Sequence, residues 1–172
     1  MVEFFPTPSY SAVSYKKRYS MKKILKFLLI EHYRINSIVY FISNSKLTFL
    51  KTLLRNYLRK KYHIIIGGAV EIKENLVFPH PMNILIGNEV KIGKNCRIYH
   101  DVTLGQNKSI FPIIHDNVII YPGAKIIGKV VVGANSIVGA NAVVTKDIPE
   151  NSIVGGVPAK IIGIRGTEDE YY

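Results

Sequence analysis

The chain has 172 residues, 48% of them apolar, and a formal net charge of +11. This length can form one domain with a sizeable core and a small helical appendage. The single cysteine, Cys96, excludes a disulfide framework within the chain, fits a reducing compartment and is expected to fill space in the core. The charge belongs to the N-terminal part, because residues 1–63 hold thirteen Lys and Arg against two Glu, whereas residues 64–172 hold ten basic and ten acidic residues.

Residues 1–20 predict an extended or disordered leader. The stretch contains two prolines, several Ser and Tyr, and no apolar periodicity. It has no continuous apolar run before a cleavage site, which argues against a signal peptide. Because Met21 opens a basic and apolar run of its own, whether residues 1–20 belong to the native protein is left open.

Residues 21–63 predict a basic helical segment with two helices, one over 22–42 and one over about 46–61. Charged residues interrupt the first helix, so no uncharged stretch is long enough to span a membrane. In the second helix we expect one apolar face and one basic face. The apolar face would hold Leu47, Leu50, Leu54, Tyr57 and Leu58, and the basic face Lys46, Lys51, Arg55, Arg59 and Lys60.

Two roles for this segment are compatible and stay open. The helices are expected to cap the first coil of the next domain, whose sheet edge would otherwise be exposed. The basic face, within residues 16–61, is also suited to contact an anionic membrane surface or an anionic glycan carrier. No nucleic-acid-binding motif accompanies the charge, so nucleic acid is not expected as a partner. We expect a cytoplasmic protein, and peripheral contact with the inner face of the membrane stays open.

Residues 64–163 contain a six-residue repeat. Thirteen positions, spaced by six apart from two interruptions, are all apolar: Ile66, Ile72, Phe78, Ile86, Ile92, Ile98, Leu104, Ile114, Ile120, Ile126, Val132, Val138 and Val144. Three places later, nine repeats carry a residue that tolerates a left-handed turn: Asn75, Asn95, Asp101, Asn107, Asn117, Gly123, Asn135, Asn141 and Asp147. The next residue is mostly small or aliphatic. A short fixed period indicates stacked units, each a short strand and a tight turn, with three sides to a coil.

Two insertions interrupt the repeat, and insertions in repeats often form loops at the working face. One adds two residues near His80, and the other adds four in the loop 105–113. One coil plus the first insertion separates His80 from His100, so we expect both histidines on one edge of the prism, a coil apart, with Pro122 and Ala140 above them. The loop is expected to protrude beside this column. Histidine can act as a general base near neutral pH.

These hexads resemble those of the left-handed β-helix acyltransferases. The resemblance implies a mainly β fold, a left-handed parallel β-helix of hexapeptide repeats over residues 64–163, preceded by the basic helical segment of residues 21–63. The left hand comes from the resemblance alone, because the general crossover rule favours right-handed connections. Residues 164–172 are expected to form an acidic, mobile tail.

The run HPMNILIGNEVKIGKNCRIYHDVTLG resembles, without a gap, the same run of the serine acetyltransferases. Two later runs, FPIIHDNVIIYPGAKIIG and GVPAKIIG, resemble the cofactor-binding coils of that family. The resemblance implies acetyl-CoA as donor, His80 as the catalytic base, no metal, and a homotrimer with its active site between subunits. It places the acceptor at His100, Asp101 and Phe111, and the cofactor near Gly105, Pro122, Ala140 and Lys160.

Two departures concern the acceptor. The serine enzymes have an Asp just before the catalytic His, where this chain has Pro79, and a second active-site His where this chain has Phe111. Without those polar groups, charge complementarity to an amino acid is lost. The FPHP form and the short basic lead-in look more like the O-acetyltransferases of surface-polysaccharide gene clusters. The expected function is therefore acetyl-CoA-dependent O-acetylation of a sugar hydroxyl in cell-surface polysaccharide biosynthesis.

Several alternatives stay open. Serine O-acetylation in cysteine biosynthesis is the first, and N-acetylation of an amino sugar is the second. A metal-dependent hydratase like the γ-class carbonic anhydrases needs three converging histidines, but His115 is expected on a different side from His80 and His100. A non-catalytic trimeric scaffold, in which His80 is dispensable, is the alternative outside enzymes. The sequence does not identify the sugar, its hydroxyl, or whether the acceptor is free, nucleotide-linked or lipid-linked.

Overall fold

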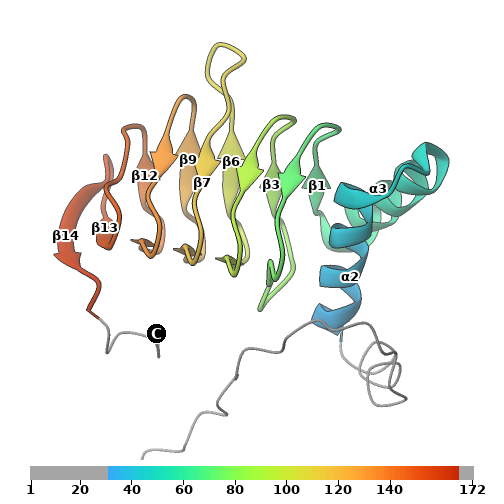
Figure 1. Cartoon of the computed structure of the whole chain (residues 1–172), viewed down its shortest axis with the longest axis horizontal. Coiled ribbons are helices and arrows are strands. Elements are labelled where there is room, and N and C mark those ends of the chain that lie inside the picture. The colour runs from blue at the N-terminus through green and yellow to red at the C-terminus, as the bar shows by residue number, and fades with distance from the viewer. Residues whose placement is uncertain (1–30, 167–172) are drawn as a thin grey trace, which may run out of the picture.

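The computed structural model describes residues 31–166, in which two helices precede a run of short strands (Figure 1). The helices are α2 (Glu31–Asn44) and α3 (Thr48–Tyr62). Sheet A contains β1 (Ile65–Ile66), β3 (Leu85–Ile86), β6 (Thr103–Gly105), β9 (Lys125–Ile127) and β12 (Val143–Val144). Sheet B contains β2 (Glu71–Ile72), β4 (Lys91–Ile92), β7 (Ile113–Ile114) and β10 (Val131–Val132). Sheet C contains β5 (Arg97–Ile98), β8 (Ile119–Ile120), β11 (Ile137–Val138), β13 (Ser152–Gly155) and β14 (Lys160–Ile164).

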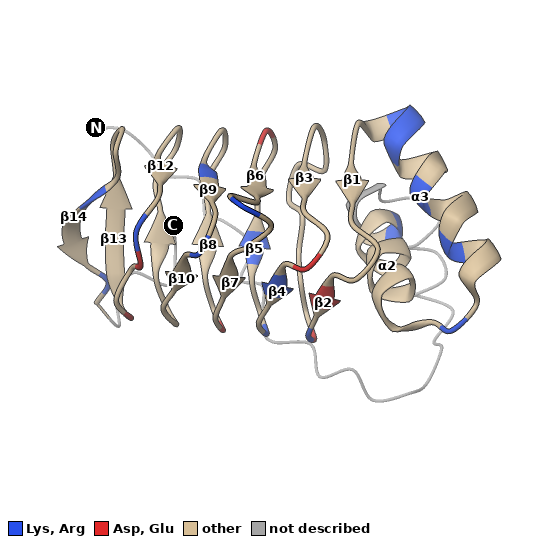
Figure 2. Cartoon of the chain, turned by 90° about the horizontal axis from the view of Figure 1, so that it is seen from above, with Lys and Arg blue, Asp and Glu red and all other residues tan. Residues whose placement is uncertain are grey.

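The chain passes through sheets A, B and C in turn, so it winds as a three-sided solenoid (Figures 1 and 2). Within each sheet, strands of successive coils pair in parallel. Leu85 lies opposite Thr103, for example, and Thr103 lies opposite Lys125 in the next coil. The predicted β-helix of hexapeptide repeats is therefore confirmed. Strand β14 differs, because it turns back and pairs antiparallel with β13.

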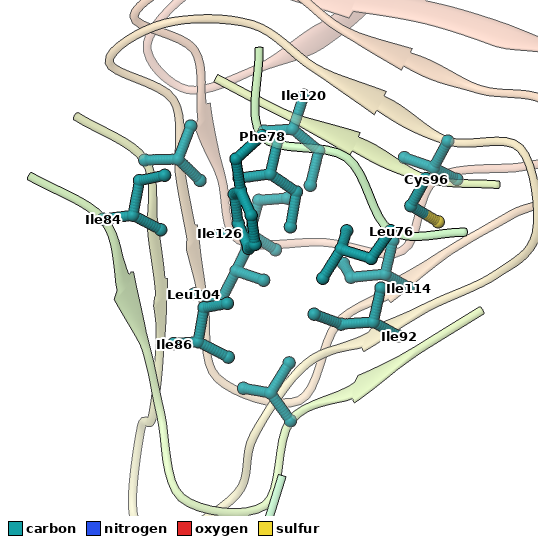
Figure 3. Packing of buried hydrophobic residues seen from close by; sticks show 14 of the residues in the cluster. Leu76, Phe78, Ile84, Ile86, Ile92, Cys96, Leu104, Ile114, Ile120 and Ile126 are labelled. Carbon is teal, nitrogen blue, oxygen red and sulfur yellow. The ribbon is translucent and has the colours of Figure 1, made fainter. Parts of the chain in front are cut away.

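The repeated apolar residues form the core of the prism. All thirteen predicted apolar positions are buried, and Figure 3 shows several of them, including Ile86, Ile92 and Leu104, pointing inward. The residues two places before them are also buried where they were predicted to point inward: Val70, Val90, Cys96, Val102, Val118, Ala124, Ser136 and Ala142. Ser136 donates its hydroxyl hydrogen to the carbonyl of Pro149 at 2.8 Å, so this buried polar group is satisfied. Burying each large aliphatic side chain stabilises the fold by about 1.5–3 kcal/mol.

The turns use left-handed backbone conformations at most of the predicted positions. Seven of the nine have a positive φ: Asn75, Asn95, Asp101, Asn117, Gly123, Asn135 and Asn141. The prediction is wrong for Asn107 and Asp147. Positive φ shifts from Asn107 to Lys108 and Ser109, because the inserted residues form their own tight turn. The Asp147 carboxylate instead accepts a hydrogen bond from the backbone N–H of Val131 at 2.8 Å.

An asparagine ladder runs along the corner between sheets B and C. Its members are Asn75, Asn95, Asn117, Asn135 and Asn151, all with φ between 55° and 60°. The side-chain amide of each of the first four donates to the amide oxygen of the next member, at distances of 2.9, 3.1, 2.9 and 3.0 Å. Asparagine suits these sites because it tolerates the left-handed conformation and carries both a donor and an acceptor.

Replacing one rung of the ladder should destabilise the solenoid. Asn95→Ala removes two hydrogen bonds and puts an ordinary residue in a left-handed conformation, for a loss of about 2 kcal/mol. Asn95→Gly also loses the bonds but keeps the backbone unstrained, so its loss should be about half as large. Urea unfolding at one fixed protein concentration measures both. Unchanged stability of Asn95→Ala would contradict the role of the ladder.

The two helices pack on the first coil. Ile35, Val39 and Ile42 of α2, together with Leu58 and Tyr62 of α3, belong to the same buried cluster as the apolar hexad residues. The hydrophobic core is therefore continuous from the helices into the solenoid. In Figures 1 and 2 both helices lie at the β1 end of the molecule, opposite β14.

Hydrogen bonds also join the helices to backbone groups of the first coil. A guanidinium N–H group of Arg55 donates to the carbonyls of Gly67 and Gly68, at 3.0 and 3.1 Å. The side-chain oxygen of Asn36 accepts from the N–H of Phe78 at 3.0 Å. These groups lie on the side of the coil where no further coil is stacked, so the helices satisfy part of an otherwise open edge.

The predicted division of α3 into an apolar and a basic face is wrong in part. Leu58 is buried and Leu54 half-buried, but Leu50 and Tyr57 are exposed, and Arg55 turns toward the solenoid. The helix has more apolar residues than its packing surface can cover. Residues 22–30 of the first predicted helix, the leader 1–20 and most of the predicted tail lie outside the described residues. Within residues 31–166, neither helix has the length and apolar character needed to cross a bilayer.

Cys96 fills a small inward position, as predicted, and its thiol lies near the carbonyl of His115 at 3.1 Å. Burial raises the pKa of this thiol to about 11. Because the thiolate is the reactive form, at pH 8 only about one thiol in a thousand is ionised.

We therefore expect the folded protein to resist a thiol reagent such as dithiobisnitrobenzoate at pH 8. Urea should expose Cys96 and allow one equivalent of thiol to react, which absorbance at the thionitrobenzoate band measures. Raising the pH toward 11 should also accelerate the reaction, because the thiolate fraction then increases. Fast reaction of the native protein at pH 8 would contradict this assignment.

Candidate active site

The corner where sheet C leads into sheet A carries the predicted column. His100 follows β5, Pro122 follows β8 and Ala140 follows β11. The N–H of Gly123 donates to the carbonyl of His100 at 3.1 Å, and the N–H of Asn141 donates to that of Pro122 at 2.9 Å. His100, Pro122 and Ala140 are thus stacked in successive coils, as the repeat predicts.

His80 lies beside this column but not in its register. Val77 pairs with Arg97, twenty residues later, so the two extra residues enter after Val77. The N–H of Asp101 donates to the carbonyl of Met82 at 3.2 Å, which places Met82 beneath His100. The inserted residues therefore displace His80 outward, where its ring is exposed.

The two imidazoles nevertheless lie side by side. The ring centroids of His80 and His100 are 6.0 Å apart, with an angle of 70° between the rings. Because His80 is exposed and His100 half-buried, this edge presents a pair of proton-accepting groups to an incoming ligand. The predicted juxtaposition of the histidines is correct, although the path that produces it differs.

An aromatic stack that the sequence analysis missed borders the histidines. The ring of Tyr99 lies 6.0 Å from that of His80, and Tyr121 stacks on Tyr99 at 5.3 Å with an interplanar angle of 21°. The signal was available, because Tyr99 and Tyr121 directly precede His100 and Pro122 in the same column. These rings give His80 an apolar neighbour on one side and limit the directions in which its imidazole can turn.

Asp101 serves the turn as well as the site. Its backbone is left-handed, with φ of 59°, and its carboxylate accepts a hydrogen bond from the side-chain amide of Asn83. The same carboxylate lies 3.9 Å from Nε2 of His100. The ammonium of Lys125 donates a hydrogen bond to the backbone carbonyl oxygen of Asp101. Asp101 is therefore a structural part of the corner, and its carboxylate lies close to the His100 ring.

The inserted loop protrudes from a different corner than predicted. It connects β6 of sheet A to β7 of sheet B, whereas the histidines lie where sheet C leads into sheet A. The loop stands out prominently at one edge in Figure 1. Gly105 ends β6 at the loop corner, so within one chain it lies away from the column of Pro122 and Ala140. Within one chain these three residues do not border one edge, because β6 intervenes between the corners.

Phe111 folds back onto its own prism. A Cβ atom added at Gly87 would lie 2.6 Å from Cε1 of Phe111, so the ring rests directly on the glycine. Phe111 is half-buried and packs against the core cluster. The absence of a side chain at Gly87 is what allows the base of the loop to lie flat on sheet A.

Adding a side chain at Gly87 should therefore release the loop. Gly87→Ala would force the Phe111 ring to move, and the exposed loop residue Lys108 should then be cut faster by trypsin. Gly68→Ala is the matched control, because its added Cβ would meet only a side-chain oxygen of Asn88 at 3.1 Å. Mass spectrometry of timed digests identifies the cut. Equal cleavage rates in both variants would contradict the contact.

Of the remaining predicted residues, Lys160 lies beyond the end of the column and His115 lies at another corner. Lys160 is exposed and pairs with Gly155, at the end of β13 that leads into the corner above Ala140. A cationic side chain there can approach the phosphates of a ligand lying along the corner. His115 follows β7 and lies at the corner between sheets B and C. Among residues 31–166, no three His, Cys, Asp or Glu side chains converge to hold a metal ion.

Comparisons with known proteins find that this chain is similar to hexapeptide-repeat transferases, and among them to serine acetyltransferases. Residues 111–146 match the family model "Bacterial transferase hexapeptide (six repeats)". A serine acetyltransferase of Mycobacterium tuberculosis is 40% identical over 100 residues, 56% of this chain and 43% of that protein. A serine acetyltransferase of Buchnera aphidicola subsp. Schizaphis graminum is 37% identical over 141 residues, 79% of this chain and 53% of that protein. The chain thus spans about half the length of the curated relatives it matches.

Solved structures give the same result. The serine acetyltransferase of Neisseria gonorrhoeae aligns with a TM-score of 0.74 and 28% identity, covering 84% of this chain and 59% of that one. A serine acetyltransferase in complex with CoA aligns with a TM-score of 0.69 and 30% identity, covering 80% and 60%. These relatives are named for serine and not for a polysaccharide. The comparisons therefore support the serine alternative better than the sugar acceptor we expected from the sequence.

Proposed function

Because the chain belongs to the hexapeptide-repeat transferases, we propose that it is an acetyl-CoA-dependent O-acetyltransferase with serine as its first candidate acceptor. The observation that carries the proposal is the pair of adjacent imidazoles, His80 and His100, on an exposed edge of the solenoid. The similarity to serine acetyltransferases, one of them in complex with CoA and one with serine, supports both the donor and the acceptor. A reduced cysteine and this donor fit a cytoplasmic enzyme.

The donor is proposed to lie along the corner above His100. Pro122 and Ala140 offer a smooth apolar edge there, and Lys160 at the last coil supplies a positive charge for the CoA phosphates. Extended along this edge, CoA brings its thioester toward the histidines. Gly105 lies at the other corner and would contact a CoA molecule only if that molecule were bound between two subunits.

The proposed reaction is direct transfer. His80 accepts the proton of the acceptor hydroxyl as its oxygen attacks the thioester carbonyl carbon of acetyl-CoA. A backbone N–H group stabilises the oxyanion, the carbon–sulfur bond breaks, and CoA leaves as the thiolate, which takes up the proton. His100, whose Nε2 lies 3.9 Å from the Asp101 carboxylate, is proposed to help hold the acceptor. General-base assistance contributes about 10²–10⁴-fold to the rate, and positioning supplies the rest.

A homotrimer would complete the site. Within one chain, the loop containing Phe111 and the histidines leave the prism at different corners. They can meet across a shared groove only if a neighbouring subunit brings its loop corner to this chain's histidine corner. We therefore propose a cyclic trimer with active sites between subunits, as the family resemblance implies.

Release of free CoA from acetyl-CoA tests the proposed function, with L-serine and a panel of sugars and amino sugars as acceptors. Serine should give turnover, and His80→Ala should lower its rate by about 10²–10⁴-fold. His115→Ala, an exposed histidine at another corner, is the matched control and should keep full activity. Undiminished turnover in folded His80→Ala would remove His80 from the mechanism. No turnover with any acceptor would leave a non-catalytic scaffold as the better reading.

A sugar is the second candidate acceptor, either as a hydroxyl or as an amino group. Two residues favour it, because Pro79 and Phe111 offer no charged group for an amino acid, and Phe111 is engaged with Gly87. The same assay separates the candidates: turnover with a sugar and not with serine would support acetylation in polysaccharide biosynthesis.

A further inference from the structure

The face of α3 turned away from the solenoid carries several large exposed apolar side chains. Phe49, Leu53 and Tyr57 are spaced by four residues and lie on one side of the helix, opposite the buried Leu58. Phe49 is 78% exposed and Leu53 is 49% exposed. Two further apolar residues, Leu47 and Leu50, are exposed beside them. Large apolar side chains exposed together on one side of a helix indicate an interaction site.

Lysines border this patch. Lys60 lies on the same side of α3 as Phe49 and Leu53, and Lys46 precedes the helix. The ammonium of Lys61 lies over the rings of Tyr57 and Tyr62, at 5.8 and 5.0 Å. A side-chain hydrogen bond with Tyr62 raises the pKa of Lys61. Helix α3 contains no acidic residue, and Figure 2 shows several Lys and Arg positions along it.

We propose that this α3 outer face, formed by Leu47, Phe49, Leu50, Leu53 and Tyr57 with Lys46, Lys60 and Lys61, docks on an anionic lipid bilayer. Apolar side chains enter the boundary between headgroups and acyl chains, while the lysines remain at the level of the lipid phosphates. The helix is too short to span the bilayer and lies along its surface. This surface is distinct from the proposed catalytic edge.

Charge favours a bilayer over a second copy of the chain. A symmetric contact through the α3 outer face would set Lys46, Lys60 and Lys61 against the same lysines of the other copy, without a carboxylate on α3 to neutralise them. The inward side of the helix is already occupied, because Arg55 is bonded to the carbonyls of Gly67 and Gly68. Helix α3 lies at one end of the solenoid (Figure 1). A bilayer on its outer face therefore leaves the later coils free of contact with the lipid.

The test is sedimentation of the full chain with vesicles at low salt. Vesicles of phosphatidylcholine mixed with phosphatidylglycerol should bind the protein, phosphatidylcholine alone should bind it weakly, and added salt should release it. Phe49→Ala with Leu53→Ala should weaken binding by about tenfold or more, through lost apolar burial. Lys46→Gln with Lys60→Gln should weaken it about 25-fold, since each lysine contributes about fivefold near an anionic surface.

Matched controls lie at sites remote from α3. Ile162→Ala with Ile164→Ala removes two apolar side chains of β14 that are 70% and 79% exposed, and Lys129→Gln with Lys146→Gln removes two exposed lysines of the solenoid. Both should bind vesicles like the parent chain. Equal losses in α3 and control variants, or no binding by the parent chain, would overturn the proposal.

Two further readouts identify another occupant of the same face. A change in oligomeric state on Phe49→Ala with Leu53→Ala, measured by sedimentation velocity with vesicle binding intact, would assign the face to a second copy. A lower thermal midpoint with unchanged vesicle binding would assign it to residues of the same chain. Either result would overturn docking on the bilayer.

Discussion

Hydrogen bonding between successive coils is the constraint on which the rest of this structure depends. Most strands contain only two residues and have no stability alone, so each is held by the coils on either side and by the apolar side chains inside. Left-handed residues such as Asn95 and Asn117 keep the corners tight, and their side chains join one corner to the next. Every coil therefore stacks in nearly the same register.

That regular stacking decides where variation can occur. An extra residue inside a strand would turn the apolar positions outward, so both insertions are accommodated at corners. Near His80 the insertion displaces an imidazole beside His100 and Tyr99. At the other corner it builds a protruding loop anchored by Phe111 on Gly87. The residues proposed to act on substrate thus lie at the two insertions that interrupt the repeat. The proposed trimer would bring these two insertions of neighbouring subunits together.

The helical segment shows a similar division of roles. The inner side of α3 continues the core, through Leu58 and Tyr62, and supplies Arg55 to the backbone of the first coil. Its outer side is not needed for that purpose, yet it carries Phe49 and Leu53. Exposed large apolar side chains lower the solubility of a protein, and burying them in a bilayer removes that cost. Protection of the first coil and location at a membrane are compatible because they use opposite sides of one helix.

The hexad period by itself determined the fold, the core and most turns, because each coil repeats the same local requirement for one large inward residue, one small one and one left-handed residue. It also predicted that His80 and His100 are neighbours. Only the tertiary structure decided which backbone lies beneath His100, at which corner the loop and Gly105 sit, and which apolar residues of α3 remain exposed. Counting residues gives the distance along the coil. These features depend instead on the corner at which an inserted residue leaves the repeat, and on how much of the surface of α3 the first coil can bury.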